Sequence, residues 1–471
     1  MHARNELYID GAWVAPAEHA GVIEVVNPAT EQVIGHVPHG TAADVDRAVT
    51  AARRAWDPDV DLVERRRRVA SIIEATKRHL PAIAALITAE MGAPIRIAES
   101  VQTKVPLAVA EGILEVLDQP ERTERISNSV ILREPYGVVG AITPWNYPLY
   151  QVIAKLVPAV AAGCTIVLKP SNEAPLSVFA FFDALHEADL PPGVVNLVSG
   201  PGRVVGEAIA GHPDVDFVSF TGSTGAGARV AEVAGAAVSK VALELGGKSA
   251  NVILDDADLT AAVKVGVSNA FLNGGQTCMA WTRMLVPADR YGEALDVAAA
   301  AAAKFTVGDP TDPSTRLGPS ATASQFETVR GFIDRALAAG ARPVTGGSER
   351  ILSPGYYLAP TILADVDPMS EIAQEEVFGP VLVVIPHTGD DDAVRIANCT
   401  PYGLSGAVWA GSDERAVSVA KRIRTGQLDI NGGAYNPRAP FGGYKKSGFG
   451  RELGPYGYEE FLQIKSLQMP T

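Results

Sequence analysis

The sequence predicts an α/β protein with two sheet-containing halves, and three observations lead to that prediction. At 471 residues the chain is too long for one ordinary hydrophobic core, so two or three domains are expected. From about residue 130, short apolar runs that end in glycine or polar residues alternate with helix-like segments. That alternation is typical of a parallel sheet covered by helices, and a second series of the same kind begins near Gly246.

The first hundred residues are expected to be largely helical, after a short hairpin at residues 8–11. Residues 41–44 read Thr-Ala-Ala-Asp, the pattern of a capping box at the start of a helix. Residues 62–89 carry apolar side chains at three- and four-residue spacing among Arg and Glu, which predicts a long amphipathic helix. The first residues lack the order of basic, apolar and small residues of an export signal, so no export is expected.

The strands of the two halves are predicted from apolar runs. In the first half the runs are VVGAITPW, CTIVLKP, VVNLVSG and VDFVSFTGS, each followed by a helix-like segment. In the second half they are SANVILDD, TRMLVPA, GYYLAPTIL and GPVLVVIP, again with helices between them. Residues 127–133 and 462–468 alternate like strands that belong to neither half. Such strands could add to the sheet of another subunit, since an unpaired strand edge invites pairing.

The composition excludes several classes of function. Forty Lys and Arg against 54 Asp and Glu give a net charge of -14, which repels nucleic acids and anionic membrane surfaces. The apolar runs are shorter than the roughly 20 residues needed to cross a bilayer. Three cysteines, Cys164, Cys278 and Cys399, lack CxxC spacing, so neither a disulfide framework nor a metal site is expected. A reducing cytoplasm fits this pattern best.

Two residues in glycine-rich segments are candidates for catalysis. Glu244 in LELGGKS could act as a mobile general base, and Cys278 in GGQTC could act as an exposed nucleophile. The alternatives are a small buried apolar cysteine and a solvated surface glutamate, and either residue by itself leaves that choice open.

Three further candidates follow predicted strands. Asn146 in ITPWNYP could present an amide that stabilises an oxyanion, or could simply hold its turn. The loop FTGSTGAG enters a helix whose N-terminus could bind a pyrophosphate, and Lys169 could reach a ribose or phosphate. The glycine spacing is not GxGxxG, so this loop could also be an ordinary tight turn.

With these segments the sequence resembles the aldehyde dehydrogenase superfamily over nearly its whole length. The segments that carry the resemblance, in order, are ITPWNYP, TIVLKPS, FTGSTGAG, LELGGKS, GGQTC, EEVFGPV and PFGGYKKSGFGRE. The resemblance implies a Rossmann-type dinucleotide-binding domain over 1–115 and 135–245 and an α/β catalytic domain over 246–448. It also implies a small bridging β element over 116–134 and 449–471 that builds homodimers or homotetramers.

The resemblance implies a reaction through a covalent thioester, with NAD(P) as the oxidant. Cys278 would attack an aldehyde, Asn146 and the Cys278 N–H would hold the oxyanion, and Glu244 would activate the hydrolytic water. Lys155 matches a proton-relay lysine of the family, although a helix-surface lysine is the alternative. Transfer of the acyl group to coenzyme A is a second function, but such enzymes generally lack a glutamate at the position of Glu244. A non-catalytic binding or structural relative is a third.

The resemblance also implies which residues contact the cofactor. They are Ile142, Thr143, Trp145, Lys169, Ser171, Asn172, Gly202, Phe220, Gly222, Ser223, Gly227, Leu245, Glu376 and Phe378. Asn172 departs from the pattern, because NAD-preferring members frequently carry there a glutamate that repels a 2′-phosphate. Glu173 follows directly and could restore a carboxylate. NAD is therefore the expected cofactor, with NADP as the alternative.

The substrate tunnel is implied more loosely. Its candidate residues are Tyr147, Gln151, Ala154, Met279, Trp281, Tyr435 and Phe441. Many members carry a large aromatic residue where this chain has Ala154. Alanine would make the wall of the tunnel more open and weakens the case for an aromatic cage that binds a cationic substrate. An aromatic or medium-chain aliphatic aldehyde is therefore expected. Arg438 is either a contact for a substrate carboxylate at the tunnel mouth or a solvated surface residue.

Overall fold

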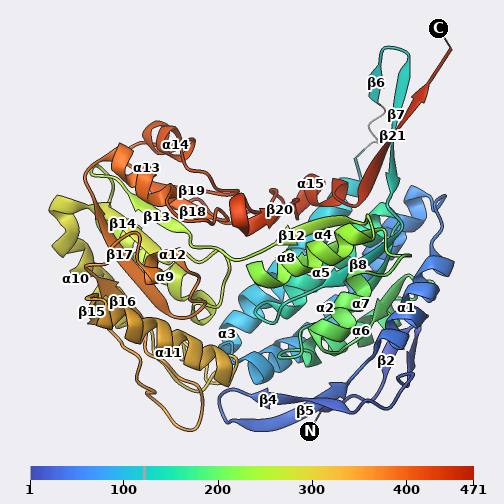
Figure 1. The fold of residues 1–471 in the computed structure, drawn as a ribbon, viewed down its shortest axis with the longest axis horizontal. Helices are drawn as coiled ribbons and strands as arrows, with labels where there is room; N and C mark the ends of the chain where they lie inside the picture. Colours follow the sequence, from blue (N-terminus) through green and yellow to red (C-terminus); the bar gives the residue numbers. More distant parts are fainter. Residues whose placement is uncertain (1, 120–123, 471) are drawn as a thin grey trace.

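The computed structural model describes residues 2–119 and 124–470, and it confirms the α/β fold. Positions 1, 120–123 and 471 lie outside the described residues, so the expected bridging element is covered only in part. Two large sheets with their helices form two halves that lie side by side, and an arm of strands projects from the body near the C-terminus (Figure 1).

The first large sheet has eight strands, and its five parallel central strands give it the Rossmann order. Reading from β10, those five follow the chain order 3-2-1-4-5, so the order reverses between β8 and β11. All four runs predicted in this half form strands. In spatial order the strands are β20 (Gly448–Phe449), β12 (Lys240–Glu244), β11 (Phe217–Thr221), β8 (Val138–Ile142), β9 (Thr165–Lys169), β10 (Val195–Leu197), β2 (Leu7–Ile9) and β3 (Ala12–Val14).

Helices cover both faces of this sheet, which explains its continuous apolar strands. In β8, Val139 and Ala141 pack into one apolar cluster, whereas Val138 and Ile142 pack into the cluster on the other face. The first face is covered by α2 (Leu62–Met91), α4 (Lys104–Leu117), α5 (Pro148–Ala162) and α6 (Leu176–Glu187), and the second by α1 (Ala42–Ala55), α7 (Glu207–Ala210) and α8 (Thr224–Ala236). Shorter helical turns of this half are α3 (Ile95–Ile97), η1 (Ala98–Gln102), η2 (Gly202–Gly206) and α15 (Gly454–Glu459).

The second large sheet has seven strands, six of them parallel, and again every predicted run forms a strand. In spatial order they are β15 (Arg342–Thr345), β16 (Thr361–Ala364), β17 (Val381–His387), β14 (Arg283–Pro287), β13 (Ala250–Ile253), β18 (Gly406–Trp409) and β19 (Asp429–Ile430). One face packs against α11 (Ala323–Ala338), α12 (Glu371–Gln374), α13 (Asp390–Asn398) and α14 (Asp413–Ala420), and the other against α9 (Leu259–Phe271) and α10 (Tyr291–Ala302). The remaining turns are η3 (Leu272–Gly275), η4 (Ala288–Arg290) and η5 (Lys445–Ser447).

The N-terminal region corrects one expectation and confirms two. It is not largely helical before residue 42, because five strands precede α1, among them β1 (His2–Ala3), β4 (Val22–Asn27) and β5 (Gln32–Pro38). The predicted hairpin is present, with Asp10 and Gly11 both at positive φ between β2 and β3, as a two-residue Asp-Gly turn requires. The predicted capping box is also present, since Thr41 and Asp44 cap each other at the start of α1.

The arm is a three-stranded antiparallel sheet made by the two outlying segments. Strand β7 (Ser129–Pro135) pairs along its whole length with β21 (Leu462–Gln468), and on its other side with β6 (Glu124–Ile126). The two segments therefore pair with each other inside one chain. Within the described residues, β21 pairs with β7 alone, so its outer edge is open. No helix in residues 2–119 and 124–470 combines the length and apolarity needed to span a membrane.

Candidate active site

Cys278 is carried by a tight loop that follows α9. Asn273, Gly274 and Gly275 adopt positive φ in succession, which turns the chain sharply ahead of the cysteine. Gly275 has no room for a side chain, because a Cβ there would lie 2.0 Å from the Gly379 carbonyl oxygen. The loop presents Cys278, partly exposed, to a cavity of about 280 Å³.

This cavity lies between the two halves, at the point where the strand order of the first sheet reverses. The loops that leave β8, β11 and β12 at their carboxyl ends all line it, which is where open α/β sheets bind dinucleotides. Its lining residues are Pro144, Trp145, Asn146, Gln151, Thr221, Gly222, Ser223, Leu245, Gly246, Cys278, Gln325, Thr328, Glu376, Val377 and Phe378. Six of them are residues predicted to contact the cofactor: Trp145, Gly222, Ser223, Leu245, Glu376 and Phe378. Asn146, predicted as a catalytic partner of Cys278, also lines the cavity.

Asn146 presents its amide beside the Cys278 loop. The side chain is buried, and its Nδ2 donates to the main-chain oxygen of Gln276 at 3.0 Å, two residues before the cysteine. An amide nitrogen carries two hydrogens, so one donor remains for a ligand in the cavity. The Asn146 Oδ1 has no hydrogen-bond partner among the described residues.

Glu244 is the last residue of β12, where the chain leaves the first sheet for the second. Its side chain is buried, and neither carboxyl oxygen has a hydrogen-bond partner in the part of the chain that the structure describes. Burial raises the pKa of Glu244 well above its ordinary value, and the charge of Glu452 raises it further, against the opposing charges of Lys155 and Arg451. Space for the carboxylate depends on Gly442, whose Cβ would lie 2.8 Å from Oε1.

Lys155 is buried rather than on a helix surface. Its Nζ forms an ion pair with Glu452, a residue of the quoted PFGGYKKSGFGRE segment for which no role was predicted. Residues 441 and 452 pair through both main-chain hydrogen bonds, which fixes the glutamate opposite α5. The signal that could have found Glu452 is Lys155 itself, since a lysine in an otherwise apolar helix needs a buried counter-charge.

The thiol of Cys278 is in an environment that favours its neutral form. Burial raises its pKa above the ordinary value, and the nearby carboxylates Glu376, Glu244 and Glu452 raise it further. The main-chain N–H of Met279, the next residue, opposes this shift. The thiolate is therefore the form that this site must generate before it can act as a nucleophile.

The predicted cofactor loop has the features of a pyrophosphate site. Ser223 caps α8, a helix of 13 residues, by accepting a hydrogen bond from the Ala226 N–H, so the helix N-terminus faces the cavity. A Cβ added at Gly202 or at Gly225 would meet nothing within 4 Å, so backbone at both places is open to a ligand. Ile142, Phe220 and Gly227 pack nearby in β8, β11 and α8.

The residues expected at the adenosine end surround the carboxyl end of β9. Lys169 is buried, donates to the Pro170 oxygen at 2.7 Å, and has a pKa lowered by burial to about 8. Ser171 bonds to the Glu173 carboxylate, and the Asn172 Oδ1 has no partner among the described residues. Thr143 lies between the two strand ends, since its N–H donates to the Lys169 carbonyl.

At the nicotinamide end, Glu376 lines the cavity as an acceptor. Its Oε1 accepts from the Gly247 N–H at 3.0 Å, and burial raises its pKa to about 7. The neighbouring Phe378 ring packs edge-on against Trp145, with centroids 5.4 Å apart. An open helix N-terminus, uncovered glycine backbone and a buried carboxyl acceptor fit a dinucleotide with its phosphates and ribose hydroxyls.

The predicted tunnel residues are only partly brought together. Tyr147 bonds to Thr277 beside the cysteine, and Tyr435 bonds to Tyr150, each hydroxyl pair at 2.8 Å. Gln151 lines the cavity, and Met279 adjoins Cys278. Three others are buried in apolar clusters: Ala154 and Phe441 in the core of the first half, and Trp281 in the cluster under the second sheet. Arg438 makes a two-pronged ion pair with Glu115 at the surface.

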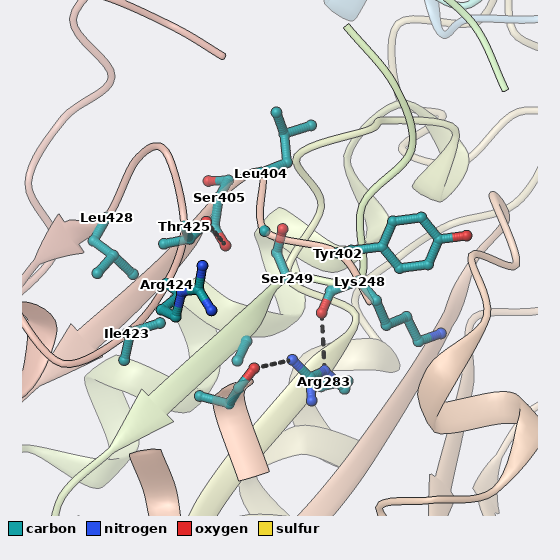
Figure 2. A pocket seen from close by; sticks show the side chains of 13 residues that line it. Lys248, Ser249, Arg283, Tyr402, Leu404, Ser405, Ile423, Arg424, Thr425 and Leu428 are labelled. Atoms are coloured by element: carbon teal, nitrogen blue, oxygen red, sulfur yellow. Dashed lines mark hydrogen bonds between the residues drawn. The ribbon is translucent and has the colours of Figure 1, made fainter. Parts of the chain in front are cut away.

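A second, much smaller cavity lies beside the linker that follows Glu244 (Figure 2). At about 10 Å³ it has room for at most one water, so it is no substrate site. Arg283 beside it is buried, and its guanidinium donates to the main-chain oxygens of Lys248, Ile396 and Ala397 at 2.7–2.9 Å. These bonds tie the end of the linker to β14 and to the C-terminus of α13.

The fold and the site together define a class of protein, a Rossmann-type α/β protein whose dinucleotide cleft holds a cysteine. The model of the Aldehyde dehydrogenase family matches residues 13–467, so the chain belongs to that family. It is 47% identical to 3-succinoylsemialdehyde-pyridine dehydrogenase of a Pseudomonas species, over 99% of each chain.

Two solved structures are similar over nearly their whole length. One is a mutant of aldehyde dehydrogenase C from Pseudomonas syringae with NAD+ and octanal, at TM-score 0.97 and 46% identity, covering 98% of this chain and 96% of that one. The other is an aldehyde dehydrogenase from Mycobacterium tuberculosis with NAD+, at TM-score 0.96 and 40% identity, covering 100% and 99%. The chain is therefore an NAD-dependent enzyme that oxidises aldehydes.

Proposed function

We propose that this chain oxidises its aldehyde through a covalent bond to the sulfur of Cys278 and releases the product by hydrolysis. The observation that carries this proposal is the arrangement of three groups. A partly exposed thiol and an amide donor with a free hydrogen line one cavity. A buried carboxyl without hydrogen bonds among the described residues, that of Glu244, does not line the cavity but lies near enough to raise the pKa of the thiol. Each group matches one requirement of acyl chemistry: nucleophile, oxyanion donor and base.

In the first stage the Cys278 thiolate attacks the aldehyde carbon. The developing oxyanion receives hydrogen bonds from the Asn146 amide and the Cys278 main-chain N–H, donors that are in place before the charge appears. When bound, NAD supplies the two-electron acceptor that converts the thiohemiacetal to a thioester. In the second stage Glu244 removes a proton from a water that attacks the thioester, and the Cys278 sulfur leaves.

The Lys155 and Glu452 pair gives the proton taken by Glu244 a route away from the site. Glu452 lies close enough to Glu244 to raise its pKa, and Lys155 opposes that shift. A proton that arrives on Glu244 can therefore pass to a neighbouring carboxylate already compensated by an ammonium group. Both partners of the pair are buried and neither lines the cavity, so the route does not pass through the substrate cleft.

For the cofactor, we propose that Gly222 and Ser223 bind the pyrophosphate and that Glu376 and Phe378 bind the nicotinamide ribose. Lys169 and the Ser171 to Glu173 segment would bind the adenosine ribose. Asn172 carries no charge and Lys169 lies beside it, so NADP is also proposed as a weaker substitute. Asn172→Glu should raise the KM for NADP about tenfold by charge repulsion and leave the KM for NAD within about twofold. An unchanged KM for NADP would show that the 2′-phosphate lies elsewhere.

The substrate class we propose is an aromatic or medium-chain aliphatic aldehyde. Tyr147, Tyr150 and Tyr435 lie near enough to Cys278 to interact with its charge, so they can supply ring surface beside it, whereas Ala154 is buried and adds no ring there. This class agrees with the pyridyl semialdehyde named for one relative and the octanal bound to another.

We also propose a homodimer or homotetramer, built through the arm that the bridging element 116–134 and 449–471 forms. The open outer edge of β21 supports this proposal, because such edges pair with another chain unless they are covered. We place the enzyme in the cytoplasm, where Cys164, Cys278 and Cys399 would persist as the free thiols observed. Native mass spectrometry at low micromolar concentration would report the number of subunits.

One assay separates the three candidate functions. Purified protein is mixed with NAD and benzaldehyde, octanal, hexanal or betaine aldehyde, with and without coenzyme A, and absorbance of reduced cofactor is followed. We expect turnover without coenzyme A, fastest with the aromatic or eight-carbon substrate. Strict dependence on coenzyme A would favour the transferase instead, and no turnover with any of these aldehydes would favour a binding or structural role.

A further inference from the structure

A buried hydrogen-bond network joins the Cys278 loop to the Asn146 loop through one side chain, that of Asn273. The Asn273 amide donates to the Asn146 main-chain oxygen at 3.0 Å and to the Gln276 main-chain oxygen at 3.4 Å. The Gln276 oxygen also accepts from the Asn146 side chain at 3.0 Å. Asn273 therefore bridges the segments that carry both proposed oxyanion donors.

The network is anchored on the far side of Asn273 by the first half of the molecule. The Gln102 Nε2 donates to the Asn273 Oδ1 at 3.0 Å and also contacts the Met91 sulfur at 3.3 Å. Gln102 and Asn273 are both fully buried, so water does not compete for these bonds. These contacts fix the two loops relative to the helices α2 and η1, which are distant in sequence from the reacting residues.

Residue 273 also needs the backbone conformation that asparagine tolerates. Its φ is +54°, in the left-handed region, where Gly and Asn are favoured over other residues. Glycine would satisfy the backbone but has no donor, and glutamine would have the donor at the wrong reach. Asparagine meets both requirements, which indicates that its amide is needed for hydrogen bonding and not only for packing.

We propose that Asn273 is the positioning residue of the oxyanion site, an inference that rests on the proposed function. It touches neither substrate nor cofactor; its two donated hydrogen bonds hold the Asn146 amide and the Cys278 N–H at the spacing that one oxyanion can bridge. Asn273 is not among the residues that line the cavity, so substrate loading and cofactor binding should not depend on it. Its loss should therefore lower kcat and spare the KM for NAD.

The test is a double-mutant cycle between Asn273→Asp and Asn146→Ala, with the fraction of folded enzyme measured by thermal unfolding. An ionised Asp removes both donated bonds, and a protonated one keeps at most one. We expect Asn146→Ala to lower kcat about 10² to 10³-fold and Asn273→Asp about 10 to 10²-fold, with the KM for NAD within about twofold. Because Asn273 acts through the donors, the double variant should fall no more than about threefold below Asn146→Ala alone.

A matched control is available in Asn196 of β10. Its Nδ2 also donates to two main-chain oxygens, those of Ile166 and Gly193, and its Oδ1 accepts from the Asp10 N–H. Asn196→Asp should therefore destabilise the fold about as much as Asn273→Asp while leaving kcat per folded enzyme within about twofold. If Asn273→Asp does not fold, Asn273→Gly keeps the backbone conformation and removes the amide.

Three results would overturn the inference while the proposed function survives. They are a wild-type kcat in the Asn273 variants, an equal loss of kcat in Asn196→Asp, or a double variant whose loss is the product of the single losses. Absence of aldehyde-dependent NAD reduction by the wild-type enzyme is a different result, because it overturns the proposed function and the inference together.

Discussion

Two buried ionisable residues lie near the two ends of the segment that connects the two sheets, and their surroundings differ. Arg283, at the start of β14, has its guanidinium bonded to three main-chain oxygens. Glu244, at the end of β12, has no hydrogen bond to either carboxyl oxygen within the described residues; the Gly443 N–H is near enough to lower its pKa but does not reach hydrogen-bond geometry. The satisfied cation holds the fold together, whereas the unsatisfied carboxyl is free to bind a water or a proton.

The same contrast separates two thiols. Cys164 is enclosed in the core of the first half, donates to the Phe461 oxygen, and has a pKa raised by burial to about 12. Cys278 opens onto the cavity and faces three carboxylates. Both thiols have raised pKa values, so access to the cavity, and not acidity alone, distinguishes the reactive sulfur from the structural one.

The largest expected effect follows removal of the reactive sulfur. Cys278→Ala should lower kcat at least about 10⁴-fold, because no other thiol is among the described residues that line the cavity, and should leave NAD binding intact. Steady-state reduction of NAD and a fluorescence titration of NAD measure the two properties. Cys164→Ala is the control and should keep kcat within about twofold; retained turnover in Cys278→Ala would remove that sulfur from the reaction.

Glu244→Gln should slow hydrolysis of the thioester by about 10² to 10³-fold, since the water loses its base. Reduction of NAD precedes that step, so stopped-flow mixing should show a burst near one equivalent per site and then a slow steady state. A variant that loses the burst together with the steady rate would place Glu244 at an earlier step.

Activity should rise with pH, by up to about tenfold per pH unit below the governing pKa. Cys278 and Glu244 act in their deprotonated forms, and burial raises the pKa of both, so the active forms are lost as pH falls and gained as pH rises through those values. In Glu244→Gln the steady rate should lose one such ionisation. Flat profiles of both kcat and kcat/KM between about pH 6 and pH 10 would show that neither raised pKa governs the rate.

The smallest effect on activity is expected at Arg283, although the fold should suffer most there. Arg283→Met leaves three buried main-chain oxygens without their donor, which should lower the free energy of unfolding by about 3 to 5 kcal/mol. The kcat per folded molecule should stay within about threefold. Urea unfolding and active-site titration separate the two quantities; an undiminished free energy of unfolding would break the contrast with Glu244.

The strands that are buried on both faces could be predicted from the sequence alone. Runs such as those of β8 and β9 are apolar throughout because helices cover each side of them, and this pattern is visible without a structure. The strands β1, β4 and β5 were missed because they are short or half-exposed and carry little periodicity. The Asp-Gly turn of the first hairpin was found because it has its own residue signature.

The candidate site was predictable where a residue's type and loop carry its chemistry, and not where a partner is distant in sequence. Cys278, Glu244 and Asn146 stand in quoted motifs; Cys278 and Asn146 line one cavity, and Glu244 lies near enough to Cys278 to raise the pKa of the thiol. Glu452 lies 297 positions from Lys155, and Asn273 lies 171 positions from Gln102, so only the folded chain brings these pairs together. Contacts of that range depend on how the two halves pack, which no local pattern specifies.

The proposed reaction depends most on an acyl group that forms on one sulfur. Glu244→Gln enzyme should be incubated with octanal and NAD, quenched in acid within the slow phase, digested, and analysed by mass spectrometry. We expect an added mass of one octanoyl group on the peptide that contains Cys278, and on no other cysteine peptide. An unmodified Cys278 after a full burst of reduced cofactor, or the acyl group on Cys164 or Cys399, would contradict it.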